Sequence, residues 1–308
     1  MGRYVTSRLL QALFIVVAIT LGVFLILRVT AGDPARVRAP VFSSPEVIEQ
    51  YRADFGTDRS IPEQLGSFAG GVVKGDLGES FRFQKPVTEL IGEALPRTLQ
   101  LALLALLMSV CIAVVLGVLA ARHPGSPWDW MASAVAAVGQ SAPVFWVGLL
   151  LSTYLAVKLG LFPAGGYDGF KSLILPAFTA ALSIVPTELR VLRESMRSTL
   201  RQEYVRAARA SGVPEWKITF KYALRNASLP LLTVIGVDVG YLLGGVIVAE
   251  VVFNFPGIGQ LALVALNARD YPLVQGITIV TASVFVLVNL AIDLLYTVVD
   301  PRIRLEAA

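Results

Sequence analysis

The sequence predicts an all-α integral membrane protein with six membrane-spanning helices. Of its 308 residues, 55% are hydrophobic and only 16% are charged, whereas roughly a quarter are charged in a soluble domain. The apolar residues gather into stretches long enough to cross a bilayer, which takes about 20 residues each. Lys and Arg residues lie mostly between these stretches. These three observations establish the membrane class before any motif is considered.

Six apolar stretches are the expected spans. The first is too long for the apolar core of a signal peptide and no clear cleavage site follows it, so we expect it to be retained. The fourth is the weakest, because Pro176 and Pro186 interrupt it and Glu188 and Arg190 lie at its end. Without it the count would be five, and the two termini would lie on opposite sides of the membrane. The expected spans are 9–27, 99–121, 131–157, 173–189, 229–252 and 277–299.

The distribution of positive charge favours six spans. The segment 190–225 holds nine Lys and Arg residues, and further basic residues lie at both termini and at Arg122. With six spans all of these fall on one side of the membrane, which the positive-inside rule identifies as the cytoplasm. Both termini are therefore expected to be cytoplasmic. The basic residues cluster between spans, so the pI near 9.3 does not indicate a nucleic-acid partner.

The long segment after the first span is expected to lie outside the cell. Its eight Lys and Arg residues do not oppose this, because long loops cross the membrane largely regardless of charge. Its Gly-Asp motifs and aromatic residues predict a small ordered subdomain. The expected organisation is a first helix (1–28), an extracytoplasmic subdomain (29–98), a core (99–299) with a cytoplasmic loop (190–228), and a cytoplasmic tail (300–308).

The cytoplasmic loop reads as a helix, a tight stop and a second helix. The first helix is predicted at 202–211, followed by Gly212 in the left-handed conformation that ends many helices. Pro214 suits the start of the next helix. Ala207 and Ala208 leave the first helix slim on one side, as docking into a partner's groove requires. The plainer interpretation is that they are only good helix formers.

This loop resembles the coupling loop, called the EAA loop, of binding-protein-dependent ABC importer permeases. Ala207, Ala208 and Gly212 match the two alanines and the glycine of that motif. Arg206 stands where the family has its leading glutamate, and Leu229-Pro230 comes later than in the sugar permeases. Both departures are usual in the dipeptide, oligopeptide and nickel subgroup.

The resemblance extends over nearly the whole chain and is closest to the first of the two dipeptide permease subunits, which has a large loop after its first span. No single motif decides it, but their order and spacing do. The matching segments are Arg8-Leu-Leu, Gly32-Asp-Pro-Ala35, Gly75-Asp-Leu-Gly-Glu-Ser80, Pro86-Val87, Leu95-Pro-Arg-Thr98, Phe255-Pro-Gly-Ile-Gly259, Arg269-Asp-Tyr-Pro272, Gln275-Gly276 and Asp300-Pro-Arg302.

The resemblance implies the type I importer permease fold, in which the first helix wraps a core of five others. It implies a subunit of a bacterial inner-membrane importer, surrounded by lipid. The implied partners are a second homologous permease, two ATPases or one fused ATPase, and an extracytoplasmic binding protein. The implied substrates are di- or oligopeptides, although other members of the subgroup move nickel, glutathione or haem.

Two sets of site residues follow from the resemblance. The first is expected to couple to the ATPase, and the second to contact the binding protein. The coupling residues are Glu203, Arg206, Ala207, Ala208, Ser211 and Gly212. The candidate binding-protein contacts are Phe255, Pro256, Gly257, Arg269, Asp270 and Tyr271, for which a plain surface loop is an equal alternative.

Asp238 lies near the middle of the fifth expected span. A charged group at that depth costs about 2.5–3.5 kcal/mol, so such residues usually face a bundle interior or a wet cavity. We interpret it either as a residue lining the pathway or as a protonated or paired contact between helices. The other spans offer no basic residue at matching depth. Water or the second permease is therefore its expected neighbour.

Catalytic motifs are missing from the sequence. It has no Gly-x4-Gly-Lys-[Ser/Thr] phosphate loop, and its only histidine, His123, lacks a cluster of metal ligands around it. We therefore expect no enzyme activity, no metal and no cofactor in this chain, with ATP and Mg²⁺ bound by partner subunits. The alternative function is a secondary transporter driven by an ion gradient, which is expected to show paired repeats and a central ion site. A membrane-embedded enzyme is the third possibility.

Overall fold

The computed structural model describes residues 2–30, 32–40 and 42–299, so the expected tail 300–308 lies outside the described residues. Across the described ranges the regular elements are helices, apart from an isolated bridge between Glu79 and Pro86. The all-α prediction is confirmed. The helices are α1 (Gly2–Thr30), α2 (Pro34–Arg38), α3 (Pro45–Asp54), α4 (Ile61–Val73), α5 (Val87–Arg122), α6 (Pro127–Ser141), α7 (Val144–Leu151), the π-helical η1 (Ser152–Lys158), α8 (Lys171–Ala181), α9 (Val185–Leu200), α10 (Glu203–Ala210), α11 (Glu215–Lys217), the π-helical η2 (Ile218–Leu224), α12 (Arg225–Val252), α13 (Ile258–Asn267) and α14 (Tyr271–Val299).

The chain forms two compact units. One unit contains residues 1–98 and 256–308, and the other contains residues 99–255. The helix α5 begins in the first unit and continues into the second. The division at residue 99 therefore falls within α5. The helices α13 and α14, however, group with the N-terminal residues rather than with the segment 99–255.

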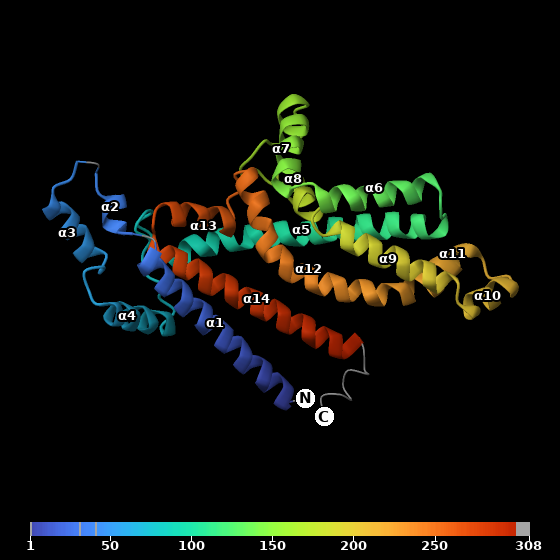
Figure 1. The fold of residues 1–308 in the computed structure, drawn as a ribbon, viewed down its shortest axis with the longest axis horizontal. Helices are drawn as coiled ribbons and strands as arrows, with labels where there is room; N and C mark the ends of the chain where they lie inside the picture. The colour runs from blue at the N-terminus through green and yellow to red at the C-terminus, as the bar shows by residue number, and fades with distance from the viewer. Residues whose placement is uncertain (1, 31, 41, 300–308) are drawn as a thin grey trace. The chain divides into compact units, whose positions relative to one another are not determined.

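In the first unit, α1 packs along α14, and the two helices run side by side in Figure 1. Leu27, Ile91, Leu273 and Ile277 lie in the same buried cluster. Gly276 permits a close approach, because a Cβ there would lie 2.4 Å from the Val87 side chain. This packing brings together the C-terminal end of α1 and the N-terminal ends of α5 and α14.

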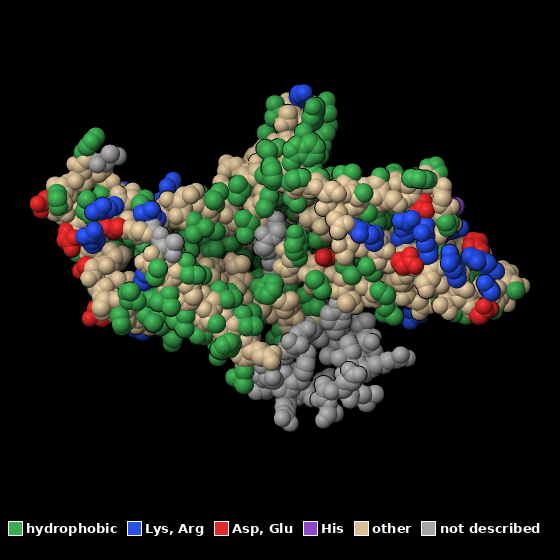
Figure 2. Space-filling model, viewed as in Figure 1, with side chains coloured by type: hydrophobic (Ala, Val, Ile, Leu, Met, Phe, Trp, Pro, Cys, Tyr) green, Lys and Arg blue, Asp and Glu red, His purple; other side chains and the backbone are tan. Residues whose placement is uncertain are grey.

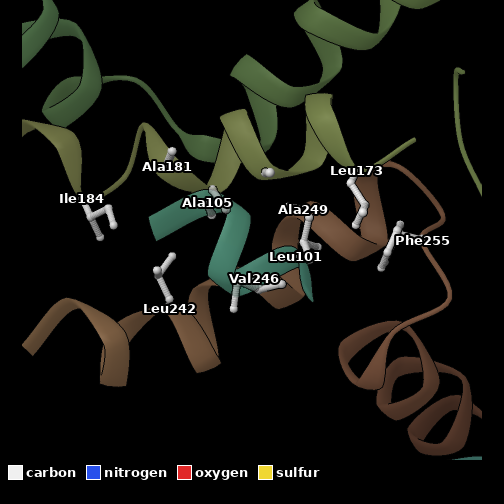
Figure 3. Close-up of a cluster of buried hydrophobic side chains, with 12 residues drawn as sticks. Leu101, Ala105, Leu173, Ala181, Ile184, Leu242, Val246, Ala249 and Phe255 are labelled. Atoms are coloured by element: carbon white, nitrogen blue, oxygen red, sulfur yellow. The ribbon is translucent and has the colours of Figure 1, made fainter. Parts of the chain in front are cut away.

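In the second unit, α12 packs against α9 and α8, and α6 packs against α9. Figure 3 shows a buried cluster to which Leu101, Leu173 and Leu242 contribute from separate helices and Phe255 from the loop after α12. Small residues such as Ala105 and Ala249 fill the rest and let the helices approach closely. Because helices in lipid gain little hydrophobic free energy by associating, close packing of this kind is what holds them.

The expected spans are not all straight helices. By length and composition, two helices can cross a membrane alone, at 87–122 and 271–292, and up to five can do so if each bent pair counts as one span. The apolar part of α1, Leu13–Val29, is shorter. Taken with α1, these segments are consistent with six spans, but the third to fifth expected spans all contain bends.

Proline explains two of these bends. The pair α6 and α7 bends by 110° at Ala142 and Pro143, and the pair α8 and α9 bends by 62° just before Pro186. Proline lacks an N–H donor and pushes the preceding residue out of the helical region, and Ala142 is indeed extended (φ −81°, ψ 130°). The expected span 131–157 therefore contains a sharp bend between α6 and α7.

Several boundaries also differ from the sequence expectation. The helix α5 begins at Val87 rather than at residue 99, and it includes Pro96. The helix α14 begins at Tyr271, before the apolar run that started at residue 277. The acidic residues Glu89 and Glu93 lower the hydropathy at the start of α5, so this start was missed. The helix α10 spans Glu203–Ala210, against an expected 202–211.

Candidate coupling site

The helix α10 ends in a Schellman turn at Gly212. Gly212 has a φ of +77°; its N–H donates to Arg209 O at 3.0 Å, and the N–H of Val213 donates to Ala208 O at 3.1 Å. These two bonds satisfy carbonyl groups that a helix end otherwise leaves unpaired. A Cβ at Gly212 would meet no atom within 4 Å, so the backbone angle alone favours glycine.

One face of α10 is packed against the rest of its unit. Val205 is fully buried, and α10 contacts η2, where Ile218 is also fully buried. Tyr204 Oη accepts a hydrogen bond from Asn226 Nδ2 at 2.9 Å. Apolar burial and this hydrogen bond attach α10 to the segment that becomes α12.

An ion pair closes the turn between α10 and α11. Arg209 Nε donates to Glu215 Oε1 at 2.7 Å, and this hydrogen bond together with the positive charge holds the pKa of Glu215 below its usual value. Both side chains are close to half exposed, so the pair contributes only about 0–1 kcal/mol. It orients the turn more than it stabilises the protein.

The opposite face of α10 is exposed and carries most of the residues predicted to couple to an ATPase. Figure 2 shows Lys and Arg side chains gathered over the end of the unit where α9, α10 and α11 meet. The structure brings the predicted coupling residues together on this one short segment. Glu203, Arg206, Ala207, Ser211 and Gly212 are exposed, and Ala208 is half-buried.

Two exposed aromatic side chains follow the turn and were missed in the sequence analysis. Trp216 is 61% exposed and Phe220 is 55% exposed. Large aromatic side chains at a surface are typical of binding interfaces. The sequence did contain a signal for them, because large aromatic residues in an arginine-rich loop are not required for the loop to fold. They could therefore have been predicted as contact residues.

A groove lies where α9 ends and α10 begins. Its volume is about 430 Å³, and it lies directly beside the exposed face of α10. Both acidic and basic side chains line it, so it suits a partner segment that carries mixed charge. The lining residues are Glu194, Arg197, Ser198, Arg201, Gln202 and Glu203.

An ion-pair cluster fixes α9 to the start of α6. Asp129 forms ion pairs with Arg193 and Arg197, the latter at 2.8 Å, and accepts a hydrogen bond from the Gly125 N–H at 2.9 Å. Arg193 also donates to Ser133 Oγ at 3.1 Å. The two arginines are one helical turn apart, so they present the same face of α9 to a single carboxylate. This cluster holds the helix that leads directly into α10, and the sequence analysis did not identify it.

Asp238 has an unexpected neighbour within this chain. It is 7% exposed and lies beside Glu188 of α9, which is fully buried, and one carboxyl oxygen of each residue has no hydrogen-bond partner in the described chain. Ser109 Oγ of α5 donates to Glu188 Oε1 at 3.2 Å. A hydrogen bond between two carboxyl groups requires a proton on one of them, because carboxylates only accept. This neighbour fits the alternative of a protonated or paired contact between helices, and the expectation of water or a second permease as the neighbour stays a prediction.

We expect Asp238→Asn to leave the fold intact, because the amide donates to the Glu188 carboxylate without a shared proton. Asp238→Leu instead removes the partner and leaves Glu188 buried with the Ser109 bond alone, which costs about 1–3 kcal/mol. Thermal unfolding of the assembled complex measures both changes. A melting temperature for Asp238→Leu at or above the wild-type value would contradict this role.

A pathway role for Asp238 remains a prediction. Loss of uptake by an assembled Asp238→Asn complex, with basal ATPase activity retained, would support it. Unchanged uptake kinetics across pH and substrates would rule it out.

Several of the motifs that carried the family resemblance converge at the start of α14. Asp270 is fully buried and accepts hydrogen bonds from Ser80 Oγ at 2.5 Å and from the Arg82 N–H at 3.0 Å. Tyr271 Oη donates to Gly32 O at 2.5 Å. Segments far apart in the sequence are thus joined through two neighbouring side chains.

Several of the residues predicted to contact a binding protein are buried within the chain. The side chains of Asp270 and Tyr271 hold the chain's own segments, and Phe255, in the other unit, is fully buried against the Tyr167 ring. Gly257 is also buried, whereas Pro256 and Arg269 are partly exposed. Contact with a binding protein stays a prediction, and only the two partly exposed residues present side-chain surface for it.

Comparison with known proteins covers the whole chain. Residues 113–305 match the family described as binding-protein-dependent transport system inner membrane component, and residues 1–102 match its N-terminal component. A probable peptide ABC transporter permease protein, y4tP of Sinorhizobium fredii, is 36% identical over 99% of this chain and 100% of its own length. The oligopeptide transport system permease protein AppB of Bacillus subtilis is also 36% identical over the same shares of both chains.

Two solved structures share the fold. A chain of the MetNI methionine ABC transporter in an inward-facing conformation has a TM-score of 0.56 and 17% identity, covering 68% of this chain and 96% of its own. A chain of an amino acid ABC transporter has a TM-score of 0.51 and 18% identity, covering 70% and 94%. At this identity the likeness concerns the fold alone.

Proposed function

Because the chain belongs to the family of binding-protein-dependent transport system inner membrane components, we propose that it is the permease subunit of an ATP-driven importer of di- or oligopeptides. The observation that carries the substrate class is the full-length similarity to permeases named for peptide transport. The membership makes the chain a transport component rather than the ATPase.

The arrangement of α9, α10 and α12 supports a mechanical role. The exposed face of α10 docks on a partner ATPase, while its buried face is attached to η2 and α12. The Asp129 cluster holds α9, which precedes α10 in the chain. The helix α10 is therefore anchored through α9 before it and through η2 after it. Movement of the ATPase then displaces two membrane helices together. Trp216 and Phe220 add apolar contact area beside α10.

The remaining parts of the importer are partners in this proposal. They comprise a second homologous permease, two ATPases or one fused ATPase that bind ATP and Mg²⁺, and an extracytoplasmic binding protein. The chain resides in the bacterial inner membrane with both termini cytoplasmic, and its segment 29–98 faces the outside. We propose no cofactor for this chain itself.

Reconstitution tests this function. The chain is co-expressed with the subunits that co-purify with it, placed in proteoliposomes with the binding protein, and supplied with a radiolabelled tripeptide. We expect peptide uptake to require ATP on the side of the membrane where the ATPase subunits lie. We also expect this uptake to continue when a proton ionophore is added. Uptake by the chain alone without ATP would contradict the proposal.

One observation favours the alternative of an ion-driven transporter. The Glu188–Asp238 pair is a buried protonatable site between two membrane helices, as a proton-coupled carrier needs. The ionophore experiment separates the two functions, because a proton-coupled carrier loses uptake when the gradient collapses. An ATP-driven importer keeps it.

Labelling tests the topology on which the function depends. Ser67 on α4 and Ser198 on α9 are both exposed, so cysteines placed there are accessible to an impermeant thiol reagent. Cys111 is exposed and free, and it is first replaced by alanine. We expect the two sites to label from opposite sides of the membrane. Labelling from the same side would remove the six-span topology.

A further inference from the structure

A cavity of about 560 Å³ lies in the unit that contains α1, α4 and α14. It is open to solvent on one side and is lined by the end of α1, the turn after α3, α4, the segment 76–84 and the start of α14. Pockets for small ligands commonly have volumes of about 300–1,000 Å³. The motif residues 76–80 and 271–272 line this cavity, so the segments joined by Asp270 and Tyr271 form its wall.

The cavity is lined by charges of both signs that are not paired with each other. Elsewhere in the same segment, acids and bases form ion pairs, as Asp33 does with Arg52 at 2.7 Å and Lys85 with Glu89 at 2.6 Å. The cavity charges form no such pair within 4 Å among the described residues. They are three arginines and three acids: Arg28, Arg38, Arg59, Asp54, Asp76 and Glu79.

Two hydrogen-bond donors, Arg28 and Gln275, line the cavity. The Arg28 guanidinium stacks 3.3 Å above the Phe24 ring, and its Nε donates to Gln64 Oε1 at 2.8 Å. Gln275 is only 4% exposed, and its Nε2 has no hydrogen-bond partner in the described chain. A buried amide donor without a partner is costly, and an acceptor in the cavity would satisfy it.

The wall of the cavity is aromatic. The Phe55 and Phe81 rings stack with their centroids 4.0 Å apart, and Phe68 stacks on Phe24 at 5.9 Å. Phe55, Phe68 and Phe81 all line the cavity. An apolar wall beside charges of both signs fits a ligand with an apolar side chain and two oppositely charged ends.

We propose that this cavity binds a zwitterionic peptide on the outer side of the membrane. Arg28 and Gln275 receive its carboxylate, the acidic rim receives its ammonium group, and the Phe55–Phe81 wall contacts a side chain. The inference rests on the proposed peptide-importer function and places a receiving site on the permease itself.

Binding to the assembled complex tests this site. The complex of permeases and ATPases is placed in nanodiscs without binding protein and titrated with radiolabelled Ala-Phe-Ala. The matched probe is the same tripeptide with an acetylated N-terminus and an amidated C-terminus. We expect saturable binding of the free tripeptide and at least about tenfold weaker binding of the capped one, since each charged hydrogen bond is worth that much.

Variants locate the site. Arg28→Gln and Gln275→Leu are each expected to weaken binding of Ala-Phe-Ala by about tenfold, and the complex of Gln275→Leu is expected to melt at or above the wild-type temperature. Arg36→Gln is the matched control, because Arg36 is exposed in the same segment and does not line the cavity. It is expected to bind as the wild type does.

Three results would overturn the inference: no binding of the free tripeptide, equal binding of the capped tripeptide, or unchanged binding by both variants. Reconstituted ATP-dependent uptake in the presence of binding protein is measured in parallel. Uptake without binding to this cavity overturns the inference alone. Absence of ATP-dependent peptide uptake overturns the proposed function as well.

Discussion

Replacing Gly212 by valine is expected to reduce transport by more than tenfold while leaving a partly assembled complex. The φ of +77° at this position strains a β-branched residue by on the order of 1 kcal/mol, although the space around it is open. The strain falls on the Schellman turn that ends α10, so the exposed face of this helix changes its orientation. Uptake and ATPase activity of the reconstituted complex are the measurements.

Two further glycine variants separate coupling from simple strain. Gly212→Asn should retain transport, because asparagine tolerates the left-handed conformation. Gly160→Val carries a comparable penalty, since Gly160 has a φ of +64° and open space around it, but it lies outside the coupling segment. We expect the Gly160→Val variant to keep its ATPase activity coupled to uptake. Wild-type transport by Gly212→Val would show that this turn has no coupling role.

Replacing Asp129 by alanine is expected to have the second large effect. It leaves Arg193 and Arg197 next to each other, partly buried and without their shared carboxylate. We expect the free energy of unfolding to fall by about 2–3 kcal/mol, which lies between the values for exposed and for fully buried ion pairs. Because α9 leads into α10, we expect a lower melting temperature and ATP hydrolysis that is no longer stimulated by peptide-loaded binding protein.

Matched variants make this prediction specific. Asp129→Glu keeps the charge and should restore most of the stimulation, which a purely structural loss would not show. Lys85→Gln breaks an ion pair between two half-exposed residues and is expected to change stability by less than about 1 kcal/mol. If Asp129→Ala unfolds and responds to binding protein as the wild type does, the cluster does not position α9.

Local sequence was enough to predict the coupling segment. The helix at 202–211 and the stop at Gly212 depend on backbone preferences of neighbouring residues, and the structure places them within one residue at each end. The membrane class depends on composition alone, and the all-α fold is confirmed. The bends at Pro143 and Pro186 were within reach of the same reasoning, but hydropathy averages over them.

The contacts between distant segments could not be predicted in the same way. Asp129 meets arginines 64 and 68 positions away, Glu188 meets Ser109 79 positions away, and Asp270 meets Ser80 190 positions away. Each pairing depends on which face of one helix packs on another. Glu188 was not named as the neighbour of Asp238, because the sequence does not state which face of α9 packs on α12.

By itself, the sequence determined that this chain is a helical membrane protein with a glycine-terminated helix in a basic loop, because hydropathy and backbone preference are properties of short segments. Only the tertiary structure decided that Asp129 holds α9, that Asp238 faces Glu188, and that the residues around Gln275 line a cavity. The physical reason is that burial, ion pairing and cavities are made by side chains from separate helices, whose rotation and depth the sequence does not state.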